Sequence, residues 1–368
     1  MNSRFLALRL RSALWGVSSA LALVAVAGVV ACEKKDEETA PAPQAEASAA
    51  PSQKSAALDP ALSRAMQSVT EGNKGPGAGK EDGPPENGIF APGMADKQLR
   101  VSDPPKITLG AAGGVPKVRL GGVAKPGLKR QISLKIMLDM GASQLPVELL
   151  LALETKSEGA NIRVSAKVTS AGLAGEAGSN PEAKAAFAAL KGSEVSYLLA
   201  PNGVPSGFAY KASSNKSSGL AQVLIAAKDV LATVIQPFPE QSVGPDALWM
   251  VTTRQGVWDL DMVTYEMVKV TKIEGDAVTL SVDTKRYAAS PNFETPFVAS
   301  DAPLSLLRLE APGQAQITFV AGDFFPISAT VTDHVSAAVG PRGEPNPAER
   351  AQMVQASWSA DLSVIKKP

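Results

Sequence analysis

Residues 131–140 read Gln-Ile-Ser-Leu-Lys-Ile-Met-Leu-Asp-Met, and their pattern of apolar and polar residues indicates the class of fold. Every second residue from Ile132 to Met140 is apolar, while Ser133, Lys135 and Asp139 alternate with them. Successive side chains of a β-strand point to opposite faces, so this period indicates a strand with one buried face and one solvated face. Such strands are typical of antiparallel sheets.

The same alternation recurs through the rest of the chain. A turn at Pro201-Asn202-Gly203 predicts a hairpin between residues 195–199 and 207–211, and Glu274-Gly275-Asp276 predicts another tight turn. In residues 257–273 the apolar side chains change face between Met262 and Val263, which predicts a bulge or a bend. The further expected strands are 147–154, 161–168, 248–253, 257–273, 277–287, 304–309, 315–320, 325–335 and 354–365.

Two helices are expected among these strands. Asn180 can cap a short helix that has Pro181 at its first position. A longer helix over residues 217–235 places its apolar residues on one stripe, and Pro237 ends it. The fold class is therefore mainly β (α+β): a large curved antiparallel sheet or half-barrel, with one long amphipathic helix packed on its concave side. A division into two domains near residues 236–245 is the alternative.

The beginning of the chain has the features of an export signal. Residues 1–31 combine the basic residues Arg4, Arg9 and Arg11 with an uncharged apolar run, as in a signal peptide. Val29-Val30-Ala31-Cys32, followed by charged residues, resembles the lipobox of bacterial prolipoproteins. The resemblance implies cleavage before Cys32 and acyl chains on that residue, which would anchor the chain to a membrane. A membrane-spanning helix with an incidental cysteine is the alternative.

The residues after Cys32 suggest where the protein is held. By resemblance to proteobacterial sorting signals, Glu33 in place of an aspartate implies the outer membrane, with the protein facing the periplasm or the cell surface. Residues 32–104 are rich in Ala, Pro, Gly, Glu and Lys, and are expected to form a disordered tether. The β-rich domain then occupies residues 105–368.

A second resemblance concerns the fold. A curved antiparallel sheet with a helix across its open side, on a lipid-anchored exported chain, resembles the lipoprotein-carrier half-barrels (LolA/LppX-like). The part from about Val234 to the C-terminus, with its Pro-rich segment and the Trp249 strand, also resembles uncharacterised bacterial lipoproteins. Neither resemblance carries functional residues over to this chain, because a fold does not fix a function.

Composition excludes several classes of function. Basic and acidic residues number 36 each, so no strong field favours nucleic acid. One cysteine and one histidine exclude an intramolecular disulfide and a zinc site with several such ligands. His334 is expected on the solvated face of a strand and Asp333 on the opposite face, which argues against a catalytic triad. We therefore expect no enzyme, no cofactor and no metal.

The carboxylates Asp246, Asp259, Asp261, Glu266 and Asp276 could form a Ca²⁺ site or a glycosidase-like pair, but charged residues on the wet face of a sheet are commoner. Two functions remain open. One is a non-enzymatic binding protein that holds a lipid or another apolar or amphipathic ligand between sheet and helix. The other is a structural or assembly lipoprotein that docks an envelope protein. The candidate ligand-binding residues are Leu220, Leu224, Ala227, Leu231, Trp249, Trp258 and Trp358, although the tryptophans could equally be core anchors.

Overall fold

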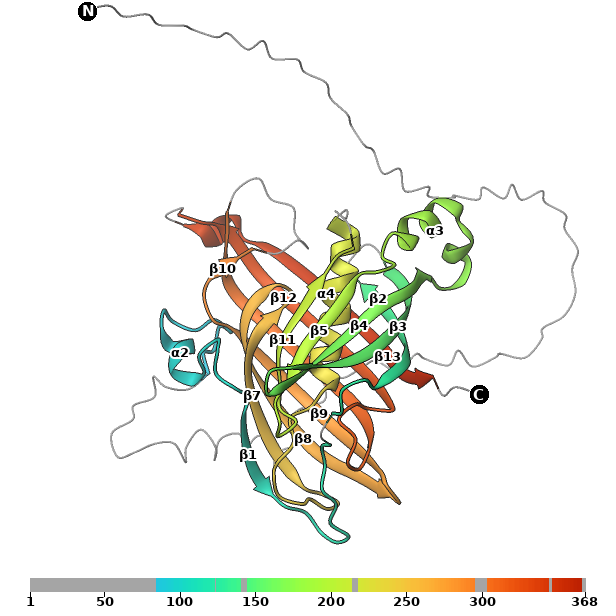
Figure 1. The fold of residues 1–368 in the computed structure, drawn as a ribbon. Coiled ribbons are helices and arrows are strands. Elements are labelled where there is room, and N and C mark those ends of the chain that lie inside the picture. Colours follow the sequence, from blue (N-terminus) through green and yellow to red (C-terminus); the bar gives the residue numbers. More distant parts are fainter. Residues whose placement is uncertain are drawn as a thin grey trace, which may run out of the picture. The chain divides into compact units, whose positions relative to one another are not determined.

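The computed structural model describes residues 84–122, 124–139, 144–213, 218–294, 303–343 and 346–365 (Figure 1). The predicted signal peptide, Cys32 and the tether up to residue 83 lie outside the described residues. Within these ranges, no helix combines the length and the apolar character needed to cross a membrane.

The fold is mainly β, as predicted, and its strands belong to one open antiparallel sheet. Among the described residues this sheet has 13 strands, β1 to β13. Their bounds are β1 Lys106–Ala111, β2 Lys129–Asp139, β3 Gln144–Glu158, β4 Asn161–Leu173, β5 Glu194–Leu199, β6 Pro205–Lys211, β7 Leu248–Val257, β8 Leu260–Glu274, β9 Ala277–Ala288, β10 Asn292–Phe293, β11 Leu304–Val320, β12 Ser328–Pro341 and β13 Gln352–Ile365. The helices are α2 Met94–Gln98, α3 Pro181–Ala188 and α4 Ser218–Val234, with short 3₁₀ turns at Gly175–Ser179 and Pro347–Arg350.

Two meanders make up the sheet. Its order is β1-β7-β8-β9-β11-β12-β13-β2-β3-β4-β5-β6, with the short β10 beside β11. The last strand therefore pairs with the first strand of the other meander, in a register that sets Trp358 opposite Leu138 and Leu362 opposite Leu134. Strands on both sides of residues 236–245 share one sheet and one core, so no domain division occurs there.

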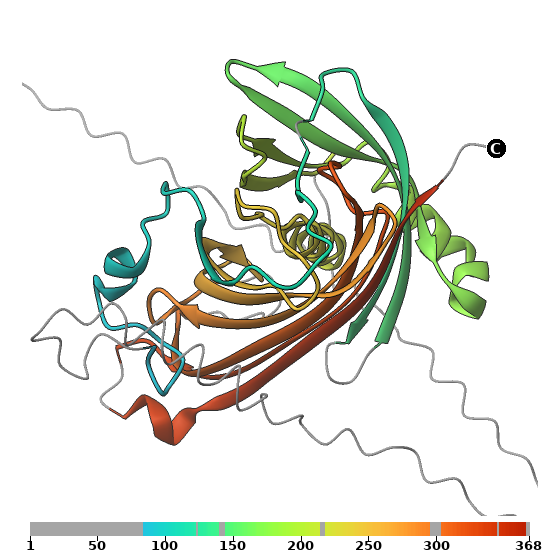
Figure 2. The same ribbon diagram turned by 90° about the horizontal axis from the view of Figure 1, so that it is seen from below.

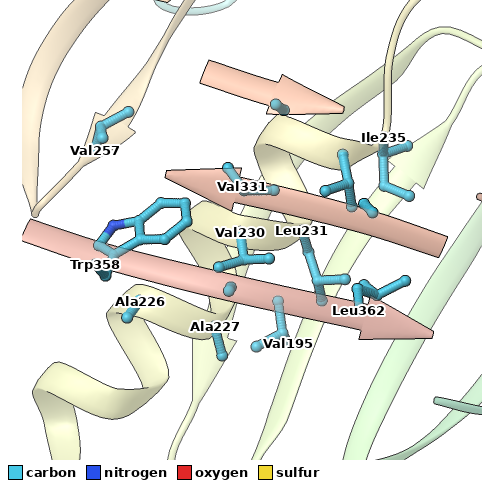
Figure 3. Close-up of a cluster of buried hydrophobic side chains, with 14 of the residues drawn as sticks. Val195, Ala226, Ala227, Val230, Leu231, Ile235, Val257, Val331, Trp358 and Leu362 are labelled. Carbon is cyan, nitrogen blue, oxygen red and sulfur yellow. The ribbon is translucent and has the colours of Figure 1, made fainter. Parts of the chain in front are cut away.

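Helix α4 connects the two meanders through the interior. It follows β6, one edge of the sheet, and leads to β7, next to the other edge strand β1. Figure 2 looks along α4 and shows the strands curving around it. In Figure 3, Val230 and Leu231 of α4 lie among Val195 of β5, Val331 of β12 and Leu362 of β13. The helix thus fills the concave side of the sheet.

The expected amphipathic character of this helix is not confirmed. From Val223 to Val234 every residue except Ala232 is buried, including Lys228, Asp229 and Thr233. A one-sided stripe predicts a helix with a wet face, but the sheet curves far enough to cover the other side as well. Consequently, the polar residues of α4 must find partners inside the protein.

Most predicted elements are confirmed, with informative exceptions. Asn180 caps α3 by accepting the backbone N–H groups of Glu182 and Ala183. Residues 304–309 and 315–320 belong to one strand, β11. The predicted strand 257–273 is wrong at its start, because Trp258 and Asp259 form the tip of the β7–β8 hairpin with φ angles of 54° and 58°. Such turns usually use Asn or Gly, and neither residue is present to indicate one here.

Of the bulge or bend predicted between Met262 and Val263, the bulge is absent. The β7–β8 register runs unbroken past both residues. Met262 faces the interior, whereas Val263 faces outward against Phe90, Ala95 and Ala289. Apolar residues therefore occur on both faces of β8, because a second layer covers its outer side.

This outer layer comes from residues assigned to the tether. Phe90 is buried, and its backbone N–H donates to the carbonyl of Ala288. Ala95 of α2 packs in the same small cluster. The expected tether boundary at residue 104 is therefore too late: the ordered part includes residues 84–104, which a few apolar side chains attach to the sheet despite the Gly- and Pro-rich composition around them.

If α4 forms the centre of the hydrophobic core, truncating one of its buried side chains should lower the free energy of unfolding as much as a central core mutation does. We expect Leu231→Ala, at a fully buried position, to lower the free energy of unfolding by about 2–5 kcal/mol. Leu150→Ala on β3, where the leucine is 43% exposed, is the matched control and should cost less than about 1 kcal/mol. Urea denaturation followed by circular dichroism measures both; equal losses would contradict a helix-filled core.

Candidate functional site

Polar side chains interrupt the apolar inner face of the sheet along one row. Register partners across four strands place Glu266 of β8 beside Thr284 of β9, then Gly313 of β11 and Asp333 of β12. Each lies on the same face of its strand as buried apolar residues. Glu266, Thr284 and Asp333 are all less than 5% exposed. Since burying ionisable groups is costly, this row is an unusual feature of the core.

Arg286 of β9 forms a buried ion pair with Asp333. Their Nη1 and Oδ2 atoms are 2.6 Å apart, and both side chains are almost inaccessible to solvent. Gly313 leaves the room for this pair, because a Cβ atom there would lie 3.2 Å from Arg286 Nη1 and 3.3 Å from Asp333 Oδ2. Burial raises the pKa of Asp333 to about 6, while Arg286 acts in the opposite direction.

Helix α4 adds a second buried pair that holds the β7–β8 turn. Lys228 Nζ lies 3.0 Å from Asp229 Oδ1 and donates to the carbonyl of Gly256 at 2.7 Å. Asp229 Oδ2 accepts the backbone N–H of Trp258 at 2.9 Å. Left-handed φ angles at Trp258 and Asp259 cost about 1–2 kcal/mol each. The bond to Asp229 and the burial of the Trp258 ring, which is 3% exposed, offset this cost.

We call Lys228, Asp229, Glu266, Arg286 and Asp333 the inner charged cluster. Its members are electrostatically coupled: Arg286 acts on Asp229, Glu266 and Asp333. Three carboxylates stand against two cations. With all five groups ionised, the cluster would carry one unbalanced negative charge in the core, and such a charge is strongly unfavourable.

Glu266 is the member with the fewest partners. Its Oε2 accepts a long hydrogen bond, 3.4 Å, from Gln236 Nε2, and within the described residues its Oε1 accepts none. Burial raises the pKa of Glu266 to about 7, against the opposing effects of Arg286 and Gln236. A carboxyl group titrating near neutrality is a feature often found at functional sites.

The Glu266 side chain lines a surface cleft of about 350 Å³. The cleft lies where the edge strand β6 approaches β7 across the end of α4. Its lining comes from residues 101–105, residues 205–208 of β6, Ala232, Ile235 and Pro237, residues 253–255 of β7, and Glu266. The two ends of the open sheet thus meet at a gap whose lining includes the carboxyl groups of Asp103 and Glu266.

The cation in the lining of this cleft is already paired. Arg254 contacts Asp261 at 2.9 Å and makes a second ion pair with Asp96 of α2. It also donates to the carbonyl of Leu99. The paired carboxylates raise the pKa of Arg254 still further above its usual range. Arg254 therefore attaches the α2 segment to the sheet and is not free to bind an anion.

The predicted ligand-binding residues lie elsewhere. Leu224, Ala227, Leu231, Trp249, Trp258 and Trp358 are all buried in the main core, and Leu220 packs against it. None of them lines the cleft. Trp249 packs against Phe238 with ring centroids 6.5 Å apart, and Trp358 lies near Ala226 and Val230 in Figure 3. The structure thus places these residues in the packing between sheet and helix.

The carboxylate candidates separate in the same way. Asp246, Asp259, Asp261 and Asp276 are exposed, as the wet-face interpretation predicts, but Glu266 is buried and that interpretation is wrong for it. His334 is exposed and Asp333 buried, which confirms that they lie on opposite faces. Among the described residues, no group of three or more His, Cys, Asp or Glu side chains could hold a metal ion.

Sequence reasoning missed the inner charged cluster, although a signal was present. Asp333 shares its strand parity with the buried Val331 and Val335, and Glu266 shares its parity with Val268 and Val270. The signal is a charged residue at one of the alternate strand positions that are otherwise apolar. The cleft left no such trace, because its walls come from segments far apart in the sequence.

No protein-family model matches the chain, and no curated protein gives a significant sequence match. The functional argument therefore depends on the geometry of the cleft and the cluster.

The raised pKa of Glu266 predicts the direction of a pH effect on stability. Between pH 4.5 and about 7 the folded protein keeps a proton on Glu266 that the unfolded chain has lost. The free energy of unfolding should therefore fall as the pH rises through this window. Asp333, raised from 3.8 to about 6, acts in the same direction at lower pH.

Glu266→Gln removes the larger of these effects. From pH 5 to pH 8 the variant should lose less stability than the unmodified protein, by up to a few kcal/mol, since one pKa unit corresponds to about 1.4 kcal/mol. Glu274→Gln, at a side chain 66% exposed, is the matched control and should follow the unmodified profile. Urea titrations at several pH values measure the difference, and identical slopes for all three proteins would refute the assignment.

Proposed function

We propose that this protein is a lipid-anchored lipoprotein of the bacterial cell envelope, and that its β-domain binds a small amphipathic ligand without catalysing a reaction. The observation that carries the proposal is the cleft at the meeting edges of the sheet. Phe208, Ile235 and Pro237 give it apolar walls, and its polar lining includes Asp103, Ser206, Thr253, Arg254 and Glu266. Small-molecule sites typically combine apolar walls with polar groups that fix the orientation of the ligand.

The geometry favours the cleft over the sheet–helix interface as the ligand's position. Side chains of α4 and of the sheet fill that interface (Figure 3). A ligand between sheet and helix would have to displace α4. The cleft instead lies at the C-terminal end of α4, where Ala232 is the one incompletely buried residue between Val223 and Val234. A ligand there contacts helix and sheet without disturbing the core.

The filled interface is also the observation that favours the second candidate, an assembly lipoprotein with no ligand. In that case the open edges of β1 and β6 would pair with an extended segment of an envelope protein. The two candidates differ in whether the cleft is occupied in the cell.

A single substitution tests whether acyl chains attach the protein to the membrane. Cys32→Ala removes the thiol that would carry lipid, so cells expressing this variant should incorporate no labelled palmitate into the protein. The unmodified protein should be labelled and, by the Glu33 argument, should sediment with outer-membrane vesicles on a sucrose gradient. Label in the Cys32→Ala variant, or an unlabelled unmodified protein, would contradict the proposal.

Occupancy of the cleft can be tested by photolabelling the full-length protein in membranes with an alkyl diazirine probe. We expect labelled peptides to map to the β6 edge and to residues 232–237. Ala232→Trp should fill the cleft and reduce the labelling by about tenfold or more. Ala186→Trp, on the exposed side of α3, is the matched control and should label normally. Labelling that is absent, or indifferent to Ala232→Trp, would favour the assembly role.

A further inference from the structure

We propose that the cleft selects ligands that carry an ammonium group, with the ammonium bound at Glu266 and the apolar part of the ligand along Phe208, Ile235 and Pro237. This inference rests on the proposed function and adds the chemical class of the ligand. Three features of the described residues support it: a surplus of hydrogen-bond acceptors, a set of unpartnered hydroxyl groups, and a missing positive charge.

The acceptor surplus lies beside the cleft at Gln236 and Glu266. Gln236 Nε2 donates to the carbonyl of Thr233 at 2.6 Å, which fixes the orientation of the amide. Its Oε1 is then an acceptor, and this atom is buried without a partner. Glu266 contributes Oε1, which no described residue contacts as a donor. Buried acceptors are rarely left unpaired, so Gln236 Oε1 calls for a donor, and Glu266 Oε1 offers a second acceptor near it.

Three threonine residues lie on neighbouring positions of the same inner face of the sheet as Glu266. Thr284 is the register partner of Glu266, Thr264 lies two residues earlier on β8, and Thr253 of the cleft lining is opposite Thr264. The Oγ1 atoms of all three are buried without hydrogen-bond partners. A hydroxyl group can accept a hydrogen bond as well as donate one. An ammonium group has up to three donors and no acceptor, which complements this set.

The charge balance of the inner charged cluster favours an ammonium group over a neutral hydrogen-bond donor. The inner charged cluster has three carboxylates and two cations, and therefore lacks one positive charge. Glu266 is the one of the three carboxylates that has no ion-pair partner within the distance of a salt bridge among the described residues. A proton on Glu266 can supply the missing charge, and so can a ligand cation. The cation in the cleft lining, Arg254, is held by Asp96 and Asp261 and lies on the outer side of β7, so it does not reverse this preference.

The test compares three probes of one chain length: hexylamine, hexanoate and hexanol. Binding to the full-length protein in lipid nanodiscs is measured at pH 8 by saturation-transfer NMR, with empty nanodiscs subtracted. This pH lies above the pKa of about 7 of Glu266, which favours the ionised carboxylate, and hexylamine is protonated. We expect hexylammonium to bind about tenfold or more tightly than either hexanol or hexanoate.

Glu266→Gln should weaken hexylammonium binding by about tenfold and change hexanol binding by no more than about twofold. Glu274→Gln is again the matched control and should leave all three affinities unchanged. Glu266→Asp keeps the charge on a shorter side chain. It should retain the order of preference even if Glu266→Gln reduces folding, which melting curves of each variant report.

Three results would overturn the inference. If hexanol and hexanoate bind as well as hexylammonium, the cleft is a site for apolar chains; the ammonium preference is then wrong while the proposed function stands. If none of the three probes binds and the diazirine probe also fails to label the cleft, both proposals fail together. An ammonium preference that survives Glu266→Gln would place the recognition on another group and would also count against the inference.

Discussion

The structure depends on one topological constraint: the chain must cross in a single step from one edge of the sheet to the strand next to the opposite edge. β6 ends the sheet order, whereas β7 lies beside the opposite edge strand, and the two are consecutive strands of the chain. The pairing of β13 with β2 makes this crossing necessary, because it joins the meanders in the middle and places their free ends apart. A sheet that curves around the connecting helix brings these ends back together. The helix then supplies the core, and the meeting ends supply the cleft.

Burying a helix on all sides has an electrostatic consequence. An all-round environment suits an apolar helix, yet α4 carries Lys228, Asp229 and Thr233. Lys228 and Asp229 pair with each other and bind the backbone of the β7–β8 turn, so these charges fix a turn whose own residues disfavour it. The sheet provides a further cation at Arg286. Buried ion pairs rarely add much stability, but they can favour one arrangement over its competitors, and here they fix the contact between helix and hairpin.

The sequence predicts the sheet well, because the alternation of apolar and polar residues that indicates a strand involves only neighbouring residues. Alternation in residues 131–140 predicts β2, and Asn180-Pro181 predicts the start of α3, since each depends only on neighbouring residues. The errors arise where tertiary contacts override that signal. Val263 looked like a change of parity because Phe90, distant in the sequence, covers the outer face of β8. The Trp258–Asp259 turn was missed because Asp229, on another element, stabilises it. The pattern of α4 gave no indication that its second face would also be covered.

Glu266 shows why the candidate site was harder to predict than the fold. In the sequence it is one of several carboxylates near the β7–β8 hairpin, and four of the five considered there are in fact exposed. Its parity distinguishes it, because it faces the same interior as Val268 and Val270. A buried carboxyl group normally requires a cation, and the nearby cation Arg286 is already committed to Asp333 at 2.6 Å. The positive charge that Glu266 still requires is supplied either by a proton or by a cationic molecule that enters between the edges of the sheet. The curvature that brings the two ends of the sheet together therefore leaves the Glu266 carboxyl group without a cation partner beside the cleft.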